Sequence, residues 1–314
     1  GLVLLLGGGD ILVRGASGLA ADLGVPSLVI GLTVVALGTS APELAVNVIA
    51  AWRDNSELSF GNIIGSNLAN LGFVLGTAAV ASPLVIHSAV NRREIPMMLL
   101  ATVVAMVLAF DVPLRGGGLA TYDRADGLVL LALLALFVYY TAMSIVQGRA
   151  ADTLAAEAIE TGTPARRGLG LNLLMTAGGL AGLILGGQVT VDSAVIVAQG
   201  IGVPEAIIGL TVIAVGTSLP ELATAVIAVR HGETDLAVGN VVGSNILNLA
   251  LVMGVTALVR PVPVPAGGAG DLLMLGVISL ALLPMAVTGG RIVRGEGALL
   301  VAGYCVYIGW RVLG

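Results

Sequence analysis

Apolar stretches of about 20 residues recur along the whole chain, with short polar segments between them. A helix of about 20 apolar residues is long enough to span the hydrocarbon core of a bilayer. A membrane β-barrel would show shorter, alternating segments instead. The pattern therefore predicts an all-α membrane protein with ten transmembrane helices. Their approximate ranges are 1–22, 26–52, 58–81, 95–111, 124–147, 168–200, 204–230, 236–258, 270–288 and 295–313.

Composition supports this class. Of 314 residues, 57% are hydrophobic and only 11% are charged, whereas soluble domains carry about 25% charged residues. No basic tract for nucleic acid is present, and the single Cys305 allows no disulfide framework. The first apolar segment lacks a basic leader region, so we interpret it as a membrane helix rather than a signal peptide. Membrane lipid and inorganic cations are the expected partners, and the sequence indicates no obligate protein partner.

One stretch of the chain appears twice. Residues 31–76 and 209–254 align without a gap at an offset of 178, and 25 of the 46 positions are identical. Flanking residues extend the match: 24–26 and 202–204 both read Gly-Val-Pro, and Pro83 matches Pro261. The first five predicted spans thus correspond to the last five.

An odd number of spans in each half forces the halves into opposite orientations, the inverted-repeat arrangement of many secondary transporters. The sequence predicts a first five-helix repeat over 1–147, a cytoplasmic linker over 148–167 and a second, inverted repeat over 168–314. With the N-terminus outside, eight arginines fall on the inner side and five on the outer side. This bias predicts that both termini are extracytoplasmic in a multi-pass protein of the cell membrane, typical of a prokaryotic inner membrane.

Each copy of the repeat carries a Pro-Glu pair in the middle of an apolar segment. Pro42 has no N–H, and its ring clashes with the Gly38 carbonyl. We therefore expect a helix break that frees carbonyl oxygens around Ala36 to Thr39, with Glu43 just beyond it. The second copy supplies the same set, namely Ala214, Thr217, Ser218, Pro220 and Glu221.

Two carboxylates in mid-membrane are costly and repel each other. A bound cation removes both problems. Glu43 and Glu221, together with nearby carbonyls and hydroxyls, form an all-oxygen set, and Ca²⁺ takes about 6–8 oxygen ligands. The membrane part of either copy holds no His or Cys, which argues against zinc or copper. The two carboxylates match one Ca²⁺ in charge, whereas Na⁺ also takes oxygens but needs less charge.

The segment that follows each break supplies neutral oxygens. Ser66 and Asn70 are four residues apart and share a helix face, as do Ser244 and Asn248. Their alternative role is interhelical hydrogen bonding without an ion. Asn67 and its counterpart Asn245 face elsewhere, so we expect them to hold helix packing. Four glycines predict close helix approach, and they are Gly61, Gly65, Gly239 and Gly243.

Other polar residues of the spans have plainer explanations. Asp10 and Arg14 are spaced to pair on one helix, and the pair is not repeated. Thr33 and its repeat partner Thr211 are expected to satisfy backbone carbonyls. His87 and His231 lie in loops, where a surface role is expected.

At the two GTSxPEL motifs and the two GSNxxN motifs the chain resembles the cation/Ca²⁺ exchanger superfamily, above all its prokaryotic sodium/calcium exchangers. The resemblance implies the sodium/calcium exchanger fold, with spans 2, 3, 7 and 8 as an ion-binding core and spans 1 and 6 as long tilted helices. It implies exchange of Na⁺ for Ca²⁺ by alternating access, three Na⁺ for one Ca²⁺, with these ions as transported substrates and no cofactor.

The resemblance also implies a role for each motif residue. Glu43 and Glu221, with the carbonyls of Thr39 and Thr217, would hold Ca²⁺. Flanking Na⁺ sites and a middle site would use Ala36, Ser40, Ser66 and Asn70 from one copy, and Ala214, Ser218, Ser244 and Asn248 from the other. Some relatives, including potassium-dependent exchangers, carry Asp at the Asn248 position. Asn there favours a chain without K⁺ co-transport.

Three other functions compete with this interpretation. Glu43 and Glu221 could instead serve Ca²⁺/H⁺ exchange or the antiport of another divalent cation. A cation channel is a further alternative, but it needs a continuous pore. An intramembrane enzyme is disfavoured, because the spans hold no Ser-His, paired-Asp or metal-His arrangement.

Overall fold

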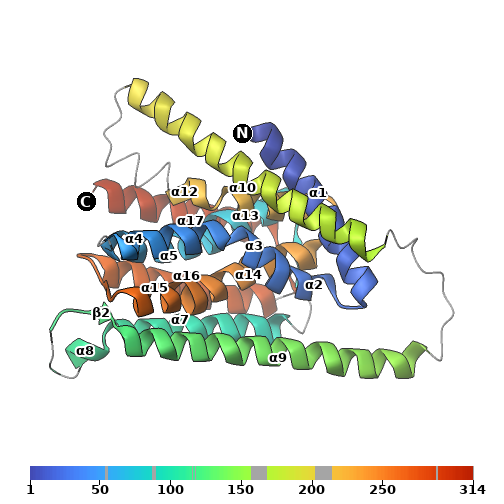
Figure 1. The fold of residues 1–314 in the computed structure, drawn as a ribbon, viewed down its shortest axis with the longest axis horizontal. Coiled ribbons are helices and arrows are strands. Elements are labelled where there is room, and N and C mark those ends of the chain that lie inside the picture. Colours follow the sequence, from blue (N-terminus) through green and yellow to red (C-terminus); the bar gives the residue numbers. More distant parts are fainter. Residues whose placement is uncertain are drawn as a thin grey trace.

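A computed structural model shows that the chain is mostly helical, with a few two-residue strands between helices (Figure 1). The structure describes residues 1–53, 56–86, 90–114, 116, 118–156, 168–201, 214–287 and 289–313. Most helices run side by side in one bundle, and a pair of long helices crosses it obliquely. In the labels below, η marks a π-helical turn.

The described elements up to residue 156 are α1 (Leu2–Leu23), α2 (Ser27–Ile30), η1 (Gly31–Val35), α3 (Ala36–Thr39), α4 (Ala41–Trp52), α5 (Ser56–Leu68), η2 (Ala69–Val74), α6 (Leu75–Ala81), β1 (Leu84–Val85), η3 (Val90–Glu94), α7 (Ile95–Ala109), α8 (Asp111–Leu114), β2 (Thr121–Tyr122) and α9 (Arg124–Ala156). Those from residue 169 onward are α10 (Leu169–Gly200), α12 (Ala214–Thr217), α13 (Leu219–Arg230), α14 (Thr234–Leu247), η5 (Asn248–Met253), α15 (Gly254–Val259), β3 (Val262–Pro263), α16 (Gly268–Val287), β4 (Arg291–Ile292) and α17 (Arg294–Leu313).

Within the described residues, six helices are long and apolar enough to cross a membrane, or seven when the bent pair 27–39 and 41–52 is one span. Helical structure also covers the predicted ranges 95–111 and 295–313, whereas residues 204–213 of the predicted range 204–230 lie outside the described residues. The fifth range differs from the prediction. Helix α9 continues through Gly148 to Ala156 and so enters the predicted linker. Several good helix formers follow Gly148, and no Pro stops the helix before Ala156.

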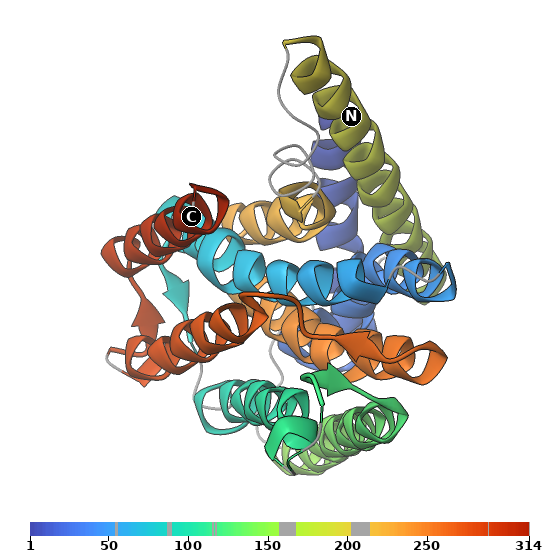
Figure 2. The same cartoon turned by 90° about the vertical axis from the view of Figure 1, so that its left-hand side faces the viewer.

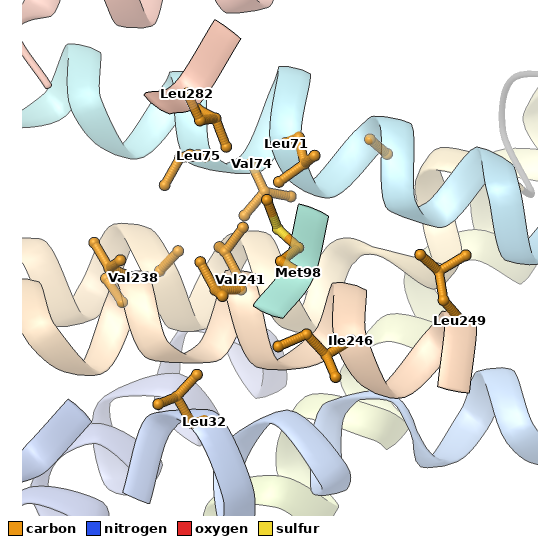
Figure 3. Close-up of a cluster of buried hydrophobic side chains, with 14 of the residues drawn as sticks. Leu32, Leu71, Val74, Leu75, Met98, Val238, Val241, Ile246, Leu249 and Leu282 are labelled. Atoms are coloured by element: carbon orange, nitrogen blue, oxygen red, sulfur yellow. The ribbon is translucent and has the colours of Figure 1, made fainter. Parts of the chain in front are cut away.

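Helix α14 lies at the centre of the core (Figure 3). Its side chains Val241 and Ile246 lie between Leu32 of η1 and residues of η2. Gly239 and Gly243 allow the backbone of α14 to contact that of α2 and η1. A Cβ on Gly239 would lie 2.6 Å from the Leu28 carbonyl oxygen, and one on Gly243 would lie 2.7 Å from the Leu32 carbonyl oxygen. The predicted close approach is therefore confirmed for this pair of glycines.

Two short strand pairs join the N-terminal and C-terminal halves of the chain. β1 pairs antiparallel with β4, Leu84 opposite Ile292. β2 pairs antiparallel with β3, Tyr122 opposite Val262. β1 and β3 occupy matching positions in the repeat, 178 residues apart. The strand after α6 in the first half therefore pairs with a strand of the second half, and the equivalent strand after α15 in the second half pairs with a strand of the first half.

The last helix of each half packs against the other half. α17 lies on α6 and η2, and α9 lies on α15 and η5. Glycines allow both contacts: a Cβ on Gly76 would be 2.8 Å from the Gly297 carbonyl oxygen, and one on Gly127 would be 2.7 Å from that of Gly254. Gly76 and Gly254 are again equivalent in the repeat, so these two contacts also form a matched set.

Helices α1 and α10 form an antiparallel pair that stands obliquely to the bundle (Figure 2). Glycine carries the contact, because a Cβ on Gly179 would be 2.6 Å from Leu12 Cα and one on Gly186 would be 2.5 Å from Leu5 N. At one end Asn172 Nδ2 donates to Asp22 Oδ2 at 2.7 Å.

A polar contact ties α1 to the end of α13. Arg14 Nε lies 3.0 Å from Asp10 Oδ2, which confirms the predicted pairing. His231 is exposed at the end of α13, as expected of a surface residue, and its Nε2 lies 2.9 Å from Asp10 Oδ1. Sequence distance hid this contact, because His231 caps α13 while Asp10 lies on the first helix. His87 lies outside the described residues.

Candidate functional site

The site is built on a break in the first copy of the repeat. The helical path from Ser27 bends by 41° between Thr39 and Ala41. Ser40 at the break has φ −84° and ψ 1°, and Pro42 occupies the first turn of α4, where its missing N–H costs nothing. The predicted break at the Pro-Glu pair is therefore confirmed.

The second copy has the same local structure. Ser218 has φ −89° and ψ 6° between α12 and α13, and Pro220 again lies in the first turn of the following helix. Glu221 takes the place that Glu43 has in α4. Each glutamate thus lies at a helix N-terminus, where the helix dipole stabilises a carboxylate.

The two carboxyl groups are buried and near each other. Glu43 and Glu221 are each 1% exposed, and their carboxyl groups lie within electrostatic range of each other. Among the described residues, neither oxygen of Glu221 nor Oε2 of Glu43 has a hydrogen-bond partner. Two carboxylates in this setting require a compensating positive charge.

Thr39 connects the first break to the second copy. Its Oγ1 donates to Asn240 Oδ1 at 3.2 Å and lies 3.5 Å from Ser244 Oγ. The same hydroxyl lies beside the Glu221 carboxyl without meeting hydrogen-bond geometry. Thr39 therefore brings the first helix break close to both α14 and Glu221. Its side chain is held by α14.

Neutral oxygens gather on the elements around this point. α13 packs on η2, and α4 packs on η5, so each glutamate helix faces the Asn-bearing turn of the opposite copy. Several buried side-chain oxygens of this region lack a hydrogen-bond partner among the described residues, and they belong to Ser40, Ser66, Asn70, Ser218 and Asn248. Buried polar atoms are normally satisfied. Hard oxygens left free in this way fit a cation such as Ca²⁺ or Na⁺.

Helix α10 covers both breaks. A Cβ on Gly38 would lie 2.5 Å from Leu180 Cδ1, and one on Gly216 would collide with the Val191 side chain. A Cβ on Gly187 would lie 3.5 Å from Pro220 Cγ, in ordinary van der Waals contact. The apolar face of one long helix thus closes off the two points where the core helices are broken.

One expectation about the break is wrong. The Ala36 carbonyl is not freed, since it accepts a hydrogen bond from Ser40 N at 2.9 Å. The helix bends sharply at one residue instead of unwinding, so α3 keeps its last backbone bond. Thr39 Oγ1 also lies 3.4 Å from the Ala36 carbonyl oxygen. The backbone of Ala214 and Thr217 lies in α12, and Thr217 is half-buried.

Two packing expectations agree with the structure. Asn67 Nδ2 donates to the Ile63 carbonyl at 2.7 Å, and Asn245 Nδ2 donates to that of Val241 at 2.8 Å. Thr33 Oγ1 donates to the Val29 carbonyl at 2.6 Å. Thr211 lies outside the described residues.

Sequence reasoning missed three features. Asn240 was overlooked although it recurs as Asn62 at the repeat offset, a signal that could have identified it. Asn47 is fully buried one turn beyond Glu43 and has no counterpart in the second copy. The π-helical turns η2 and η5 begin at or next to Asn70 and Asn248, and such turns are frequent at functional sites.

Comparison with known proteins identifies the family. The family model "Sodium/calcium exchanger protein" matches residues 1–143 and 171–313. The chain belongs to the sodium/calcium exchanger family.

Individual relatives agree along the whole length. The sodium/calcium exchanger MaX1 of Methanosarcina acetivorans is 33% identical, over 98% of this chain and 95% of the relative. The inner membrane protein YrbG of Escherichia coli is 36% identical, over 98% of this chain and 93% of the relative. A solved structure of the sodium-calcium exchanger NCX_Mj, soaked with Na⁺ and Sr²⁺, matches with a TM-score of 0.82 and 30% identity. The match covers 98% of this chain and 95% of the NCX_Mj chain.

Membership in the sodium/calcium exchanger family makes the chain a multi-pass membrane protein and a cation antiporter. The exchanger fold predicted from the motifs is confirmed by the match to NCX_Mj. The family consists of transporters, which agrees with the interpretation that the chain is not an enzyme.

Proposed function

We propose that the chain exchanges Na⁺ for Ca²⁺ by alternating access, with Glu43 and Glu221 as the shared acidic ligands. The observation that carries this proposal is the burial of two carboxyl groups, one from each copy of the repeat, among oxygens that have no hydrogen-bond partner in the described part of the chain. Ca²⁺ and Na⁺ compete for the same carboxylates, so they do not occupy the core together.

Each ion has its own set of neutral ligands in this proposal. The carbonyls of Thr39 and Thr217 join the glutamates around Ca²⁺. The Na⁺ and middle sites are formed by the remaining residues of the two motifs, namely Ala36, Ser40, Ser66, Asn70, Ala214, Ser218, Ser244 and Asn248. The buried oxygens of Ser40, Ser66 and Asn70, which have no hydrogen-bond partner among the residues that the structure describes, support this assignment.

The proposed architecture is ten transmembrane helices in two inverted repeats, 1–147 and 168–314. The matched strand pairs β1–β4 and β3–β2 support it, because equivalent elements make equivalent contacts with the halves exchanged. We place both termini on the extracytoplasmic side and the linker 148–167 in the cytoplasm, on the arginine distribution.

Coupling follows from the cost of the empty site. A core with two bare carboxylates would carry two negative charges across the apolar barrier, which is unfavourable. Only the loaded core moves, so the inward flow of Na⁺ expels Ca²⁺. Three Na⁺ for one Ca²⁺ moves one net charge per cycle, which is worth about 2.3 kcal/mol per 100 mV.

The coupling ion is best tested with separate gradients. Purified protein is reconstituted into liposomes, and Na⁺, K⁺ and H⁺ gradients are imposed one at a time. The uptake of ⁴⁵Ca²⁺ is measured under each gradient. The proposal predicts uptake driven by Na⁺ alone, saturable and dependent on a counter-ion. Uptake driven by a pH gradient without Na⁺ would favour Ca²⁺/H⁺ exchange, and flux without any counter-ion would indicate a channel.

A further inference from the structure

Asn47 stands directly behind Glu43 on α4. It is fully buried, at 0% exposed. Its Nδ2 donates to the Glu43 carbonyl oxygen at 2.7 Å, which holds the amide against the Glu43 turn. Residues four apart share a helix face, so Asn47 lies on the face of α4 that carries Glu43. Its Oδ1 has no hydrogen-bond partner in the part of the chain that the structure describes.

The second copy of the repeat shows that packing does not require this amide. The equivalent position holds Ala225, which is also 0% exposed. Ser59, whose Oγ donates to the Asn47 carbonyl at 3.4 Å, is likewise replaced by the buried Ala237. The fold therefore fills the same two places with methyl groups in one copy and with polar groups in the other. A buried amide oxygen without a partner is a net cost, and such a group calls for an explanation.

Asn67 makes a similar backbone bond and also has a free oxygen, yet its position differs. It lies about 100° around the helix from Ser66, and it recurs in the second copy as Asn245. A packing role common to both copies accounts for it. Asn47 occurs once, on the face of the acidic ligand, and no such packing role accounts for it.

We infer that Asn47 Oδ1 is a further neutral ligand for the cation held beside Glu43. The inference rests on the proposed function and adds to it. The bond from Nδ2 fixes the amide so that its oxygen remains available, and an amide oxygen is a hard donor suited to a dehydrated Ca²⁺ or Na⁺. The two copies then offer unequal surroundings: a carboxylate with an amide in the first, and a carboxylate with the Ala225 methyl in the second.

The test measures ⁴⁵Ca²⁺ binding to the purified full chain in detergent, together with Tm in the absence of Ca²⁺. Asn47→Ala should raise the Kd for Ca²⁺ by about three- to tenfold. It should leave Tm nearly unchanged, because alanine is the residue at the equivalent position. Asn47→Asp keeps an oxygen in place and should bind Ca²⁺ at least as tightly as the wild type. The matched control Asn67→Ala should lower Tm and leave Kd within about twofold.

The outcomes separate this inference from the proposed function. A normal Kd in Asn47→Ala, while Glu43→Gln loses binding, would overturn the role of Asn47 and leave the exchanger site intact. An equal rise of Kd in Asn47→Ala and Asn67→Ala would also overturn it, since a general packing effect would then be at work. A wild-type chain that binds no Ca²⁺ would overturn the proposed function and this inference together.

Discussion

Thr39 Oγ1 donates to Asn240 Oδ1 at 3.2 Å, and this bond joins the helix break of the first repeat copy to α14 of the second. Both residues are 0% exposed. Because the hydroxyl is held by α14, the backbone of Thr39 is fixed at the point where the proposal needs its carbonyl. The bond therefore positions a ligand without using the hydroxyl as one.

A double-mutant cycle tests that relationship. Thr39→Val and Asn240→Ala should each raise the Kd for Ca²⁺ by about five- to tenfold, because each releases the Thr39 backbone. The double variant should be little worse than either single variant, since the two residues act through one bond. Additive losses in a ⁴⁵Ca²⁺ binding assay would show that the residues act separately.

The α1–α10 pair offers a matched test of glycine packing. Gly179→Ala places a methyl group 2.6 Å from Leu12 Cα, where only backbone could move. It should destabilise the protein by about 1–3 kcal/mol. Gly178→Ala meets no atom of the described residues within 4 Å and should leave stability unchanged. Size-exclusion chromatography after stepwise heating measures both, and equal behaviour of the two variants would contradict the close contact.

Glu94 gives a prediction about pH. It lies just before α7, is 1% exposed, and accepts a hydrogen bond from Arg93 Nε at 2.8 Å. Burial raises the pKa of Glu94, against the opposing charge and hydrogen bond of Arg93. The folded chain therefore holds this proton more tightly than the unfolded chain. Stability contributed by Glu94 falls as pH rises from the ordinary carboxyl pKa through the raised value.

Glu94→Gln removes that ionisation. The variant should be more stable than the wild type at pH 7–8, with Tm higher by about 2 °C, and the difference should shrink toward pH 4.5. Arg93→Gln is the matched control, because it removes the compensating charge and should steepen the loss of Tm with pH. A constant difference between Glu94→Gln and wild type across the range would rule out the buried carboxyl as the cause.

Asn248→Asp would add a third carboxylate near the first two. Three such groups cannot all be ionised together at low cost, so one holds a proton until a cation displaces it. Calcium flux in liposomes should then depend on pH more steeply than in the wild type, or acquire a dependence on K⁺. Flux that is unchanged across pH and K⁺ would show that this position does not face the ions.

Periodicity and the repeat predicted most of the helices and the two helix breaks, because long apolar runs and a mid-span Pro-Glu pair constrain the backbone locally. What they missed depends on contacts between the halves. The bond between Thr39 and Asn240, the contact of His231 with Asp10 and the cover of Gly38 by Leu180 join residues distant in sequence. The free oxygen of Asn47 also needed coordinates, since only its burial and its bond to Glu43 set it apart.

The account depends most on the two acidic side chains, and substituting them one at a time tests it most directly. Glu43→Gln and Glu221→Gln keep shape and burial but remove one charge each. In liposomes with an imposed Na⁺ gradient, each variant should lower ⁴⁵Ca²⁺ uptake by at least about 30-fold, since losing a buried charged ligand costs 2 kcal/mol or more. Uptake at the wild-type rate in either variant would contradict the account.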